Sequence, residues 1–165
     1  MTIRYFAYGA NMSAALMRHH GVHFASRVPA RLPGFRLEFN VTVPRHPGLG
    51  YANIVPDPAG VVEGALYELD DAALAVLDTY EDYPTCYGRQ QVTVVLADGR
   101  SLLAITYVAN PERVRAGLRP SRTYLRHLLA GRDLLSPAYY ARVYQTPTEK
   151  FTAPETRFPS RRRVC

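Results

Sequence analysis

The sequence predicts an α+β fold built around a small curved or barrel-like antiparallel sheet. Three observations favour this class: short segments of strand length recur along the chain, one pair of them is joined by a strong hairpin signal, and short helical segments are interspersed between them. A chain of 165 residues is long enough to bury a core and suits one domain. We expect that domain over residues 1–148 and an extended, Arg- and Pro-rich tail over 149–165.

The first third of the chain predicts two strands and a helix. Residues 3–8 form an aromatic-rich strand that runs into the small-residue turn Gly9-Ala10-Asn11. Ser13 then begins a helix that ends near residue 20. Residues 35–39 alternate apolar and polar side chains, which is typical of a half-buried strand. Residues 41–51 contain two prolines and two glycines and are expected to form a long loop.

The middle of the chain predicts two more strands and a helix. Residues 52–55 and 61–69 are rich in apolar side chains and are expected to be strands. A helix follows over residues 70–81, because its first two residues are aspartates that suit the cap position and the segment after them favours helix.

The remaining elements are a hairpin and two helices. Residues 91–96 and 101–108 flank Ala97-Asp98-Gly99-Arg100, and Asp-Gly accepts the positive φ that a tight hairpin turn needs. Residues 121–130 form a helix that starts at a Pro-Ser pair and stops at a glycine. A tyrosine-rich helical segment spans residues 137–144.

Composition limits the class of protein. An apolar content of 47% and a charged content of 21% are ordinary for a soluble globular protein. The sequence shows neither a membrane-spanning run nor a signal peptide, so we expect a cytoplasmic protein without a membrane partner. The net charge of +6 is carried by scattered arginines, and only residues 161–163 form a dense run, so no nucleic-acid partner is expected. A salt-sensitive nucleic-acid contact through the tail is the alternative, and the sequence gives no prediction of oligomeric state.

The second predicted helix ends on a candidate catalytic residue. Leu74 and Leu77 set its apolar stripe, and four residues past Leu77 the stripe reaches Glu81. The neighbouring acids Asp78 and Asp82 fall beside the stripe and can face solvent. Because a buried carboxylate loses hydration, the pKa of Glu81 is expected to rise towards neutrality, which suits a general base and acid. The alternative is that the helix frays at its end and the side chain turns to solvent.

The turn after the first strand is a candidate anion site. Gly9 lets the backbone turn tightly and approach a ligand closely. The helix start that follows offers unpaired N–H groups at the positive end of its dipole. A buried strand that simply ends in a turn is the alternative.

Other reactive residues fit catalytic or metal-binding patterns less well. The five histidines show no metal-ligand spacing, so no metal and no cofactor are expected. Cys86 lies near Glu81 in sequence, but no histidine lies locally to activate it, and we interpret it as a small apolar core residue. Tyr87 and Tyr107 can hydrogen-bond a substrate, although most of the 12 tyrosines must serve packing.

Taken together, these segments resemble the γ-glutamylcyclotransferase-like family. The family's opening strand, Tyr-Phe-Ala-Tyr-Gly-Ser-Asn followed by Leu or Met, stands here as YFAYGANM over residues 5–12. Further matches follow in the family's order: ARLPGFRL at 30–37, YANI at 51–54, VEGALY at 62–67, LDTYE at 77–81 for the family's Leu-Asp-x-x-Glu, Tyr87 with Arg89, the strand of Tyr107, and Pro120-Ser121-x-x-Tyr124. The resemblance covers residues 3 to about 144.

The resemblance implies a small, mostly antiparallel or mixed β-barrel surrounded by short helices, with a pocket between the first loop and the end of the acidic helix. It implies a catalytic glutamate at Glu81. The substrate-binding residues that it implies are Tyr8, Gly9, Ala10, Asn11, Tyr87 and Tyr107.

The implied reaction on a γ-glutamyl compound needs no cofactor. Glu81 removes a proton from the α-ammonium, the amine attacks the γ-carbonyl, and 5-oxoproline forms as Glu81 returns the proton to the leaving amine. Backbone N–H groups near Gly9 and Ala10 stabilise the oxyanion.

Two positions depart from the family pattern. Ala10 replaces the usual serine, and Asp82 replaces the usual glycine after the glutamate. The substrate stays open among γ-glutamyl amino acids, γ-glutamyl amines and γ-glutamyl-protected biosynthetic intermediates. A non-catalytic module of the same fold that binds a γ-glutamyl or carboxylate ligand is the alternative function.

Overall fold

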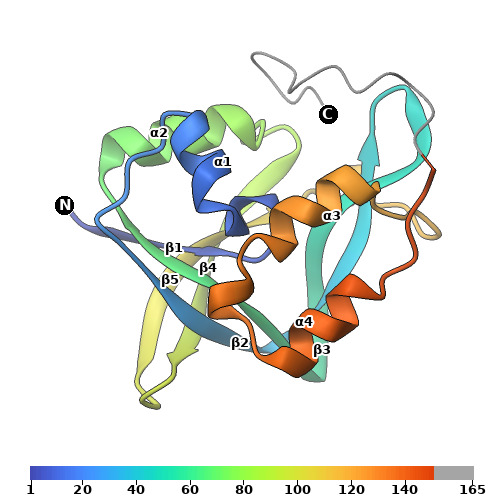
Figure 1. The fold of residues 1–165 in the computed structure, drawn as a ribbon. Coiled ribbons are helices and arrows are strands. Elements are labelled where there is room, and N and C mark those ends of the chain that lie inside the picture. Colours follow the sequence, from blue (N-terminus) through green and yellow to red (C-terminus); the bar gives the residue numbers. More distant parts are fainter. Residues whose placement is uncertain (151–165) are drawn as a thin grey trace.

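Five strands close into a barrel in the order β1-β3-β2-β4-β5 (Figure 1). The structure is a computed structural model, and it describes residues 1–150. Its strands are β1 (Ile3–Ala7), β2 (Ser26–Val43), β3 (His46–Leu69), β4 (Tyr87–Leu96) and β5 (Ser101–Ala109). Neighbouring strands pair antiparallel, except that β1 runs parallel to β5 where Tyr5 pairs with Ile105. The predicted α+β class and the small barrel are confirmed.

Short helices surround this barrel. The α-helices among the described residues are α1 (Ala14–His19), α2 (Asp71–Tyr80), α3 (Arg122–Leu129) and α4 (Pro137–Tyr144), and single 3₁₀ turns are η1 (Ala10–Met12), η2 (Pro111–Arg113) and η3 (Arg132–Leu134). Each α-helix begins after a residue whose side-chain oxygen accepts a backbone N–H of the first turn: Ser13, Asp70, Ser121 and Ser136. Local capping therefore fixes where these helices start, as the sequence predicts.

The predicted loop over residues 41–51 is wrong. β2 and β3 form one long hairpin whose turn lies near Arg45, which has a φ of 63°. The glycines and prolines that suggested a loop belong mostly to β3. At Gly50 an added Cβ would lie 2.2 Å from the Phe39 carbonyl oxygen, so this glycine permits close approach of the two strands. The strands predicted over 52–55 and 61–69 are both parts of β3, and the strand over 35–39 is part of β2.

The side chains of β1 divide between two apolar clusters. Phe6, and Tyr8 just after the strand, pack in the cluster that includes Leu32 and Ile54. Tyr5 and Ala7 pack in a second cluster, which includes Leu77 of α2 and Leu125 of α3. This alternation follows from the two-residue period of a strand. The end of β1 therefore brings together residues from both clusters, and the chain then turns at Gly9.

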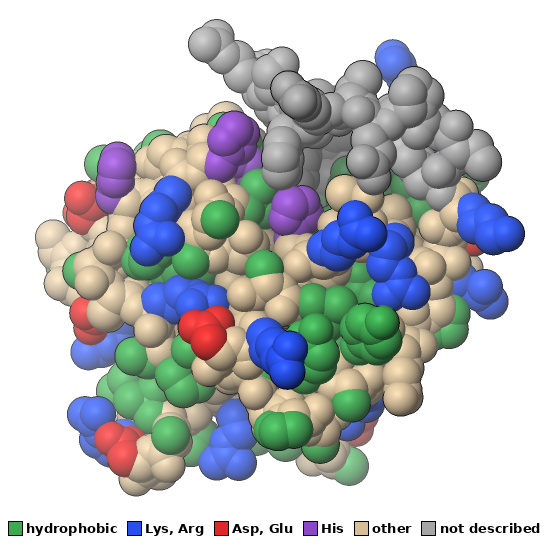
Figure 2. All heavy atoms as spheres, viewed as in Figure 1, with side chains coloured by type: hydrophobic (Ala, Val, Ile, Leu, Met, Phe, Trp, Pro, Cys, Tyr) green, Lys and Arg blue, Asp and Glu red, His purple; other side chains and the backbone are tan. Residues whose placement is uncertain are grey.

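The described part of the chain holds no helix that is both long and apolar enough to cross a membrane. Of the tail predicted over 149–165, residues 151–165 lie outside the described residues. Glu149 still belongs to the described part, where its N–H donates to the Pro120 carbonyl. On the face seen in Figure 2, the Lys and Arg side chains of the described residues are spread between apolar and other side chains.

Candidate active site

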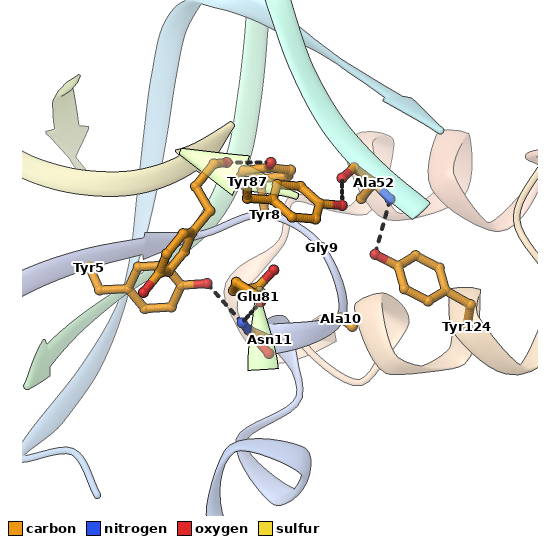
Figure 3. Close-up of a pocket in the computed structure, with 10 residues that line it drawn as sticks. Tyr5, Tyr8, Gly9, Ala10, Asn11, Ala52, Glu81, Tyr87 and Tyr124 are labelled. Carbon is orange, nitrogen blue, oxygen red and sulfur yellow. Dashed lines mark hydrogen bonds between the residues drawn. The ribbon is translucent and has the colours of Figure 1, made fainter. Parts of the chain in front are cut away.

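A pocket opens where β1 ends, at the junction of the barrel and the helices (Figure 3). All seven candidate site residues from the sequence line it, and three further residues do so as well. The lining residues are Tyr5, Tyr8, Gly9, Ala10, Asn11, Ala52, Glu81, Tyr87, Tyr107 and Tyr124. The pocket thus joins the first loop to the end of α2, and strands β3, β4 and β5 and helix α3 also contribute to it.

Glu81 supplies the carboxylate of the pocket. It is the C-cap residue of α2, where its N–H donates to the Leu77 carbonyl at 2.9 Å. Its side chain is 8% exposed, so the helix does not fray before this residue, and the apolar stripe correctly predicts that Glu81 faces inward. The next residue, Asp82, has a φ of 50° and does not line the pocket. This positive φ explains why a glycine suits that position.

Asn11 holds the Glu81 carboxylate. Its Nδ2 donates to Glu81 Oε1 at 2.7 Å and to Tyr5 Oη at 2.9 Å, so both amide hydrogens are used within the pocket (Figure 3). Its backbone carbonyl accepts from Tyr67 Oη at 2.8 Å. Asn11 is buried, and its amide group therefore has a fixed orientation towards the acid. A hydrogen bond to the charged form favours the carboxylate, which opposes the effect of burial on Glu81.

Two other tyrosines of the pocket give their hydroxyl hydrogens to acceptors within the protein. Tyr8 Oη donates to the Tyr107 carbonyl at 2.6 Å. Tyr107 Oη donates to Asp78 Oδ1 at 2.7 Å, and Arg89 donates to both oxygens of the same carboxylate. Asp78 therefore contacts a pocket residue and an arginine, and its side chain is only partly exposed to solvent, at 20%.

A strand irregularity exposes backbone groups to the pocket. The register of β2 against β3 shifts between Glu38 and Val41, so Ala52 has no paired residue across the ladder. Its N–H donates to Tyr124 Oη at 3.0 Å, and its carbonyl accepts from Tyr87 Oη at 2.9 Å (Figure 3). Tyrosines from α3 and β4 thus satisfy strand groups that the bulge leaves open.

Gly9 in the first loop lies close to Ala52 and Tyr124. A Cβ added at Gly9 would lie 3.0 Å from the Ala52 Cβ and 3.2 Å from Tyr124 Oη, tighter than most Cβ contacts. Gly9 is the N-cap of η1, and the N–H groups of Ala10 and Asn11 stand at the first positions of that turn, where they have no intrahelical acceptor. The side chain of Ala10 contributes no polar atom, so only backbone groups serve polar contacts here.

Three tyrosines of the pocket, Tyr5, Tyr8 and Tyr107, stay protonated in the neutral range. Burial raises the pKa of the Tyr5 and Tyr8 hydroxyls well above its ordinary value, and the nearby charge of Glu81 raises it further. Burial also raises the pKa of Tyr107, and so does its hydrogen bond to Asp78. These hydroxyls therefore act as neutral hydrogen-bonding groups around one carboxylate.

Sequence reasoning missed Tyr5, Ala52 and Tyr124 as lining residues. Tyr5 belongs to the motif over residues 5–12, but the motif alone does not show which of its side chains line a pocket. Tyr124 follows the capping residue of α3 and reaches the pocket only because that helix packs on η1. Cys86 is fully buried and does not line the pocket. Within residues 1–150, no cluster of three or more His, Cys, Asp or Glu side chains is placed to hold a metal ion.

Comparisons with known proteins place the chain in a family. The family model described as "Gamma-glutamyl cyclotransferase, AIG2-like" matches residues 5–126. The Drosophila melanogaster protein CG2811, provisionally named a gamma-glutamylcyclotransferase, is 27% identical over 111 residues, which cover 66% of this chain and 70% of that protein.

Solved structures share the fold. A structure titled gamma-glutamyl cyclotransferase superposes with a TM-score of 0.79 at 22% identity and covers 93% of both chains. A yeast gamma-glutamyl cyclotransferase, described as specific to glutathione, gives a TM-score of 0.60 at 17% identity over 86% of this chain and 93% of that one.

Proposed function

Because this chain belongs to the gamma-glutamyl cyclotransferase, AIG2-like family, we propose that it cleaves a γ-glutamyl amide and releases 5-oxoproline with a free amine or amino acid. The substrate's own α-amine attacks its γ-carbonyl, and Glu81 acts first as general base and then as general acid. One observation carries this proposal: a buried carboxylate, held by Asn11 at 2.7 Å, faces the same pocket as the first loop.

The protons of the reaction balance through Glu81. The attacking nitrogen goes from NH₃⁺ to the lactam N–H and gives up two protons, while the leaving nitrogen goes from an amide N–H to NH₃⁺ and takes up two. Glu81 carries these protons from one nitrogen to the other as the new C–N bond forms and the old one breaks. A carboxylate that is buried, yet held by an amide donor, suits both directions of transfer.

The first loop supports the charge that develops on the γ-carbonyl oxygen. Ala10 and Asn11 line the pocket with Glu81, and their N–H groups, which have no acceptor within the η1 turn, are the donors proposed for this oxygen. Because the attack is intramolecular, holding the substrate in the ring-closing shape supplies a large part of the rate, up to several kcal/mol. In this proposal the tyrosines that line the pocket restrict the substrate to that conformation.

The test is 5-oxoproline release by the purified protein from γ-glutamyl amino acids, γ-glutamyl amines including ε-lysine adducts, and γ-glutamylated natural-product intermediates. We expect release from at least one class and a fall in kcat of about 10²- to 10⁴-fold for Glu81→Gln. Asp82→Asn is the matched control, since it removes a neighbouring carboxylate that does not line the pocket.

Near-normal turnover by folded Glu81→Gln would exclude Glu81 as the base. Silence across the whole panel, together with measurable binding of the same compounds, would favour the non-catalytic binding module of the same fold.

A further inference from the structure

Asp78 lies one helical turn before Glu81 and contacts the pocket through another residue. The two acids are three positions apart on α2 and so share one side of the helix. Asp78 Oδ1 accepts from Tyr107 Oη at 2.7 Å, and Tyr107 is 2% exposed and lines the pocket with Glu81. Asp78 itself does not line the pocket, so any effect that it has there passes through Tyr107.

The arginine beside it fixes the carboxylate in place. Arg89 Nε donates to Asp78 Oδ1 at 2.9 Å, and its Nη2 donates to Asp78 Oδ2, which gives a two-point contact. Arg89 is the cross-strand partner of Tyr107 in the β4–β5 ladder, so the acid and the phenol are held against the same pair of strands. The guanidinium also lies over the Tyr83 ring, 4.8 Å from its centroid.

The contact with Asp78 determines whether the Tyr107 hydroxyl can donate a hydrogen bond to a ligand or only accept one. A phenol has one hydrogen and can also accept. With its hydrogen given to Asp78, the hydroxyl of the lining residue Tyr107 has only lone pairs left for any other partner. An ionised acid cannot donate in return, so the direction of this hydrogen bond is fixed. The Tyr8 hydroxyl, which donates to the Tyr107 carbonyl, is likewise left with lone pairs. The lining residues therefore include two phenol acceptors besides the Glu81 carboxylate, a set that suits a group with several N–H donors.

Building on the proposed function, we propose that Asp78, clamped by Arg89, is a positioning residue that makes the Tyr107 hydroxyl an acceptor for the substrate's α-ammonium. This contact then adds affinity for a ligand with an α-ammonium over its α-hydroxy counterpart. An α-hydroxyl offers one hydrogen where the ammonium offers three, and an N-acylated amine offers one and adds bulk. Asp78→Asn would reverse the contact, because the new amide can donate to Tyr107 and turn the phenol hydrogen towards the ligand.

The experiment uses an inert pair of ligands. L-Methionine sulfone keeps the α-ammonium and α-carboxylate and carries a sulfonyl group that cannot be attacked as an acyl group, and its α-hydroxy counterpart differs only at the α-substituent. Calorimetry gives the ratio of their dissociation constants for the wild type, Asp78→Asn, Tyr107→Phe, the double variant, and the control Asp82→Asn. Thermal melts establish that each variant folds.

We expect the wild type to prefer the amine and Asp78→Asn to lose about tenfold or more of that preference, with the control unchanged. Asp78→Asn should have little further effect once Tyr107 is phenylalanine, because it acts through that hydroxyl. Where activity is measurable, KM should rise more than kcat falls. If Asp78→Asn does not fold, Asp78→Ala removes the acceptor of the Tyr107 hydrogen and gives the same test.

An unchanged ratio in Asp78→Asn, an undiminished effect in the Tyr107→Phe background, or failure of both ligands to bind the wild type would each overturn the proposal. The readout does not depend on turnover. Loss of preference in Asp78→Asn with no 5-oxoproline release by the wild type would therefore count against the proposed reaction alone.

Discussion

Asn11→Asp is the most informative single change in the pocket. It preserves the size of the side chain and replaces the amide nitrogen, 2.7 Å from Glu81 Oε1, with a carboxylate oxygen. Two full negative charges at 2.7 Å repel by about 6 kcal/mol at an effective dielectric constant of about 20. That energy corresponds to between four and five pKa units, roughly, so the two acids must share one proton at neutral pH.

A shared proton occupies the group that the proposed reaction needs as its base. We expect 5-oxoproline release by Asn11→Asp at pH 7 to fall by about 100-fold or more, with the activity profile moved to higher pH. Initial rates between pH 5 and pH 9 measure both effects. The raised pKa also means that the folded state holds a proton that the unfolded chain has released. The free energy of unfolding should therefore fall with rising pH, starting from the unfolded carboxyl pKa near 4.

Asn53→Asp is the matched control. Asn53 is also a buried asparagine with two hydrogen bonds, since its Nδ2 donates to Asn40 Oδ1 and its Oδ1 accepts from the Ala109 N–H. It does not line the pocket. The control should therefore lose stability while keeping the pH dependence of activity. A wild-type rate and profile in Asn11→Asp would refute the idea that the amide of Asn11 maintains Glu81 as a usable base.

Three further outcomes are expected. Gly64→Ala places a Cβ 2.3 Å from a β1 carbonyl oxygen and should lower the free energy of unfolding in urea by about 1–3 kcal/mol; Gly88→Ala, with its nearest neighbour at 3.4 Å, is the control. Asp82 has a φ of 50°, so Asp82→Val should destabilise by about 1–2 kcal/mol, whereas Asp82→Gly should be close to neutral in the same assay. Because burial raises the pKa of Tyr5 and Tyr8, their protons stay bound in the folded state above about pH 10, where the unfolded chain loses them. Thermal midpoints should therefore show no tyrosine contribution to pH dependence below pH 10 and a progressive fall above it.

Local chemistry made part of the fold and site predictable. The helix that carries Glu81 follows from an Asp70 cap and the spacing of Leu74 and Leu77, all within one short segment. The hairpin at Gly99, which has a φ of 86°, follows equally from its turn residues. Such features depend on neighbours in sequence, and a single sequence contains that information.

Features set by distant partners were not predictable in this way. Asp78 looked solvent-facing because its contact with Tyr107 joins residues 29 positions apart. The sequence places Gly50 in a loop. In the structure it lies in a hairpin strand, where the lack of a side chain lets the Phe39 backbone of the neighbouring strand come close. Tyr124 belongs to a family motif, but its place in the pocket depends on the packing of α3 beside the first loop. In each case the tertiary arrangement gives the residue its role.

The way in which the barrel closes has a consequence for protein synthesis. β1 leaves the ribosome early, but the Thr106 hydroxyl that donates to the Phe6 carbonyl lies 100 positions later. At roughly 5–20 residues per second, the first strand waits about 5–20 s before that partner is made. β1 can pair with β3 before then, because β3 ends at Leu69, but the barrel cannot close until β5 is made. Ligand binding by a stalled nascent chain should appear only after Tyr124 has cleared the exit tunnel, because the pocket has no complete wall before then.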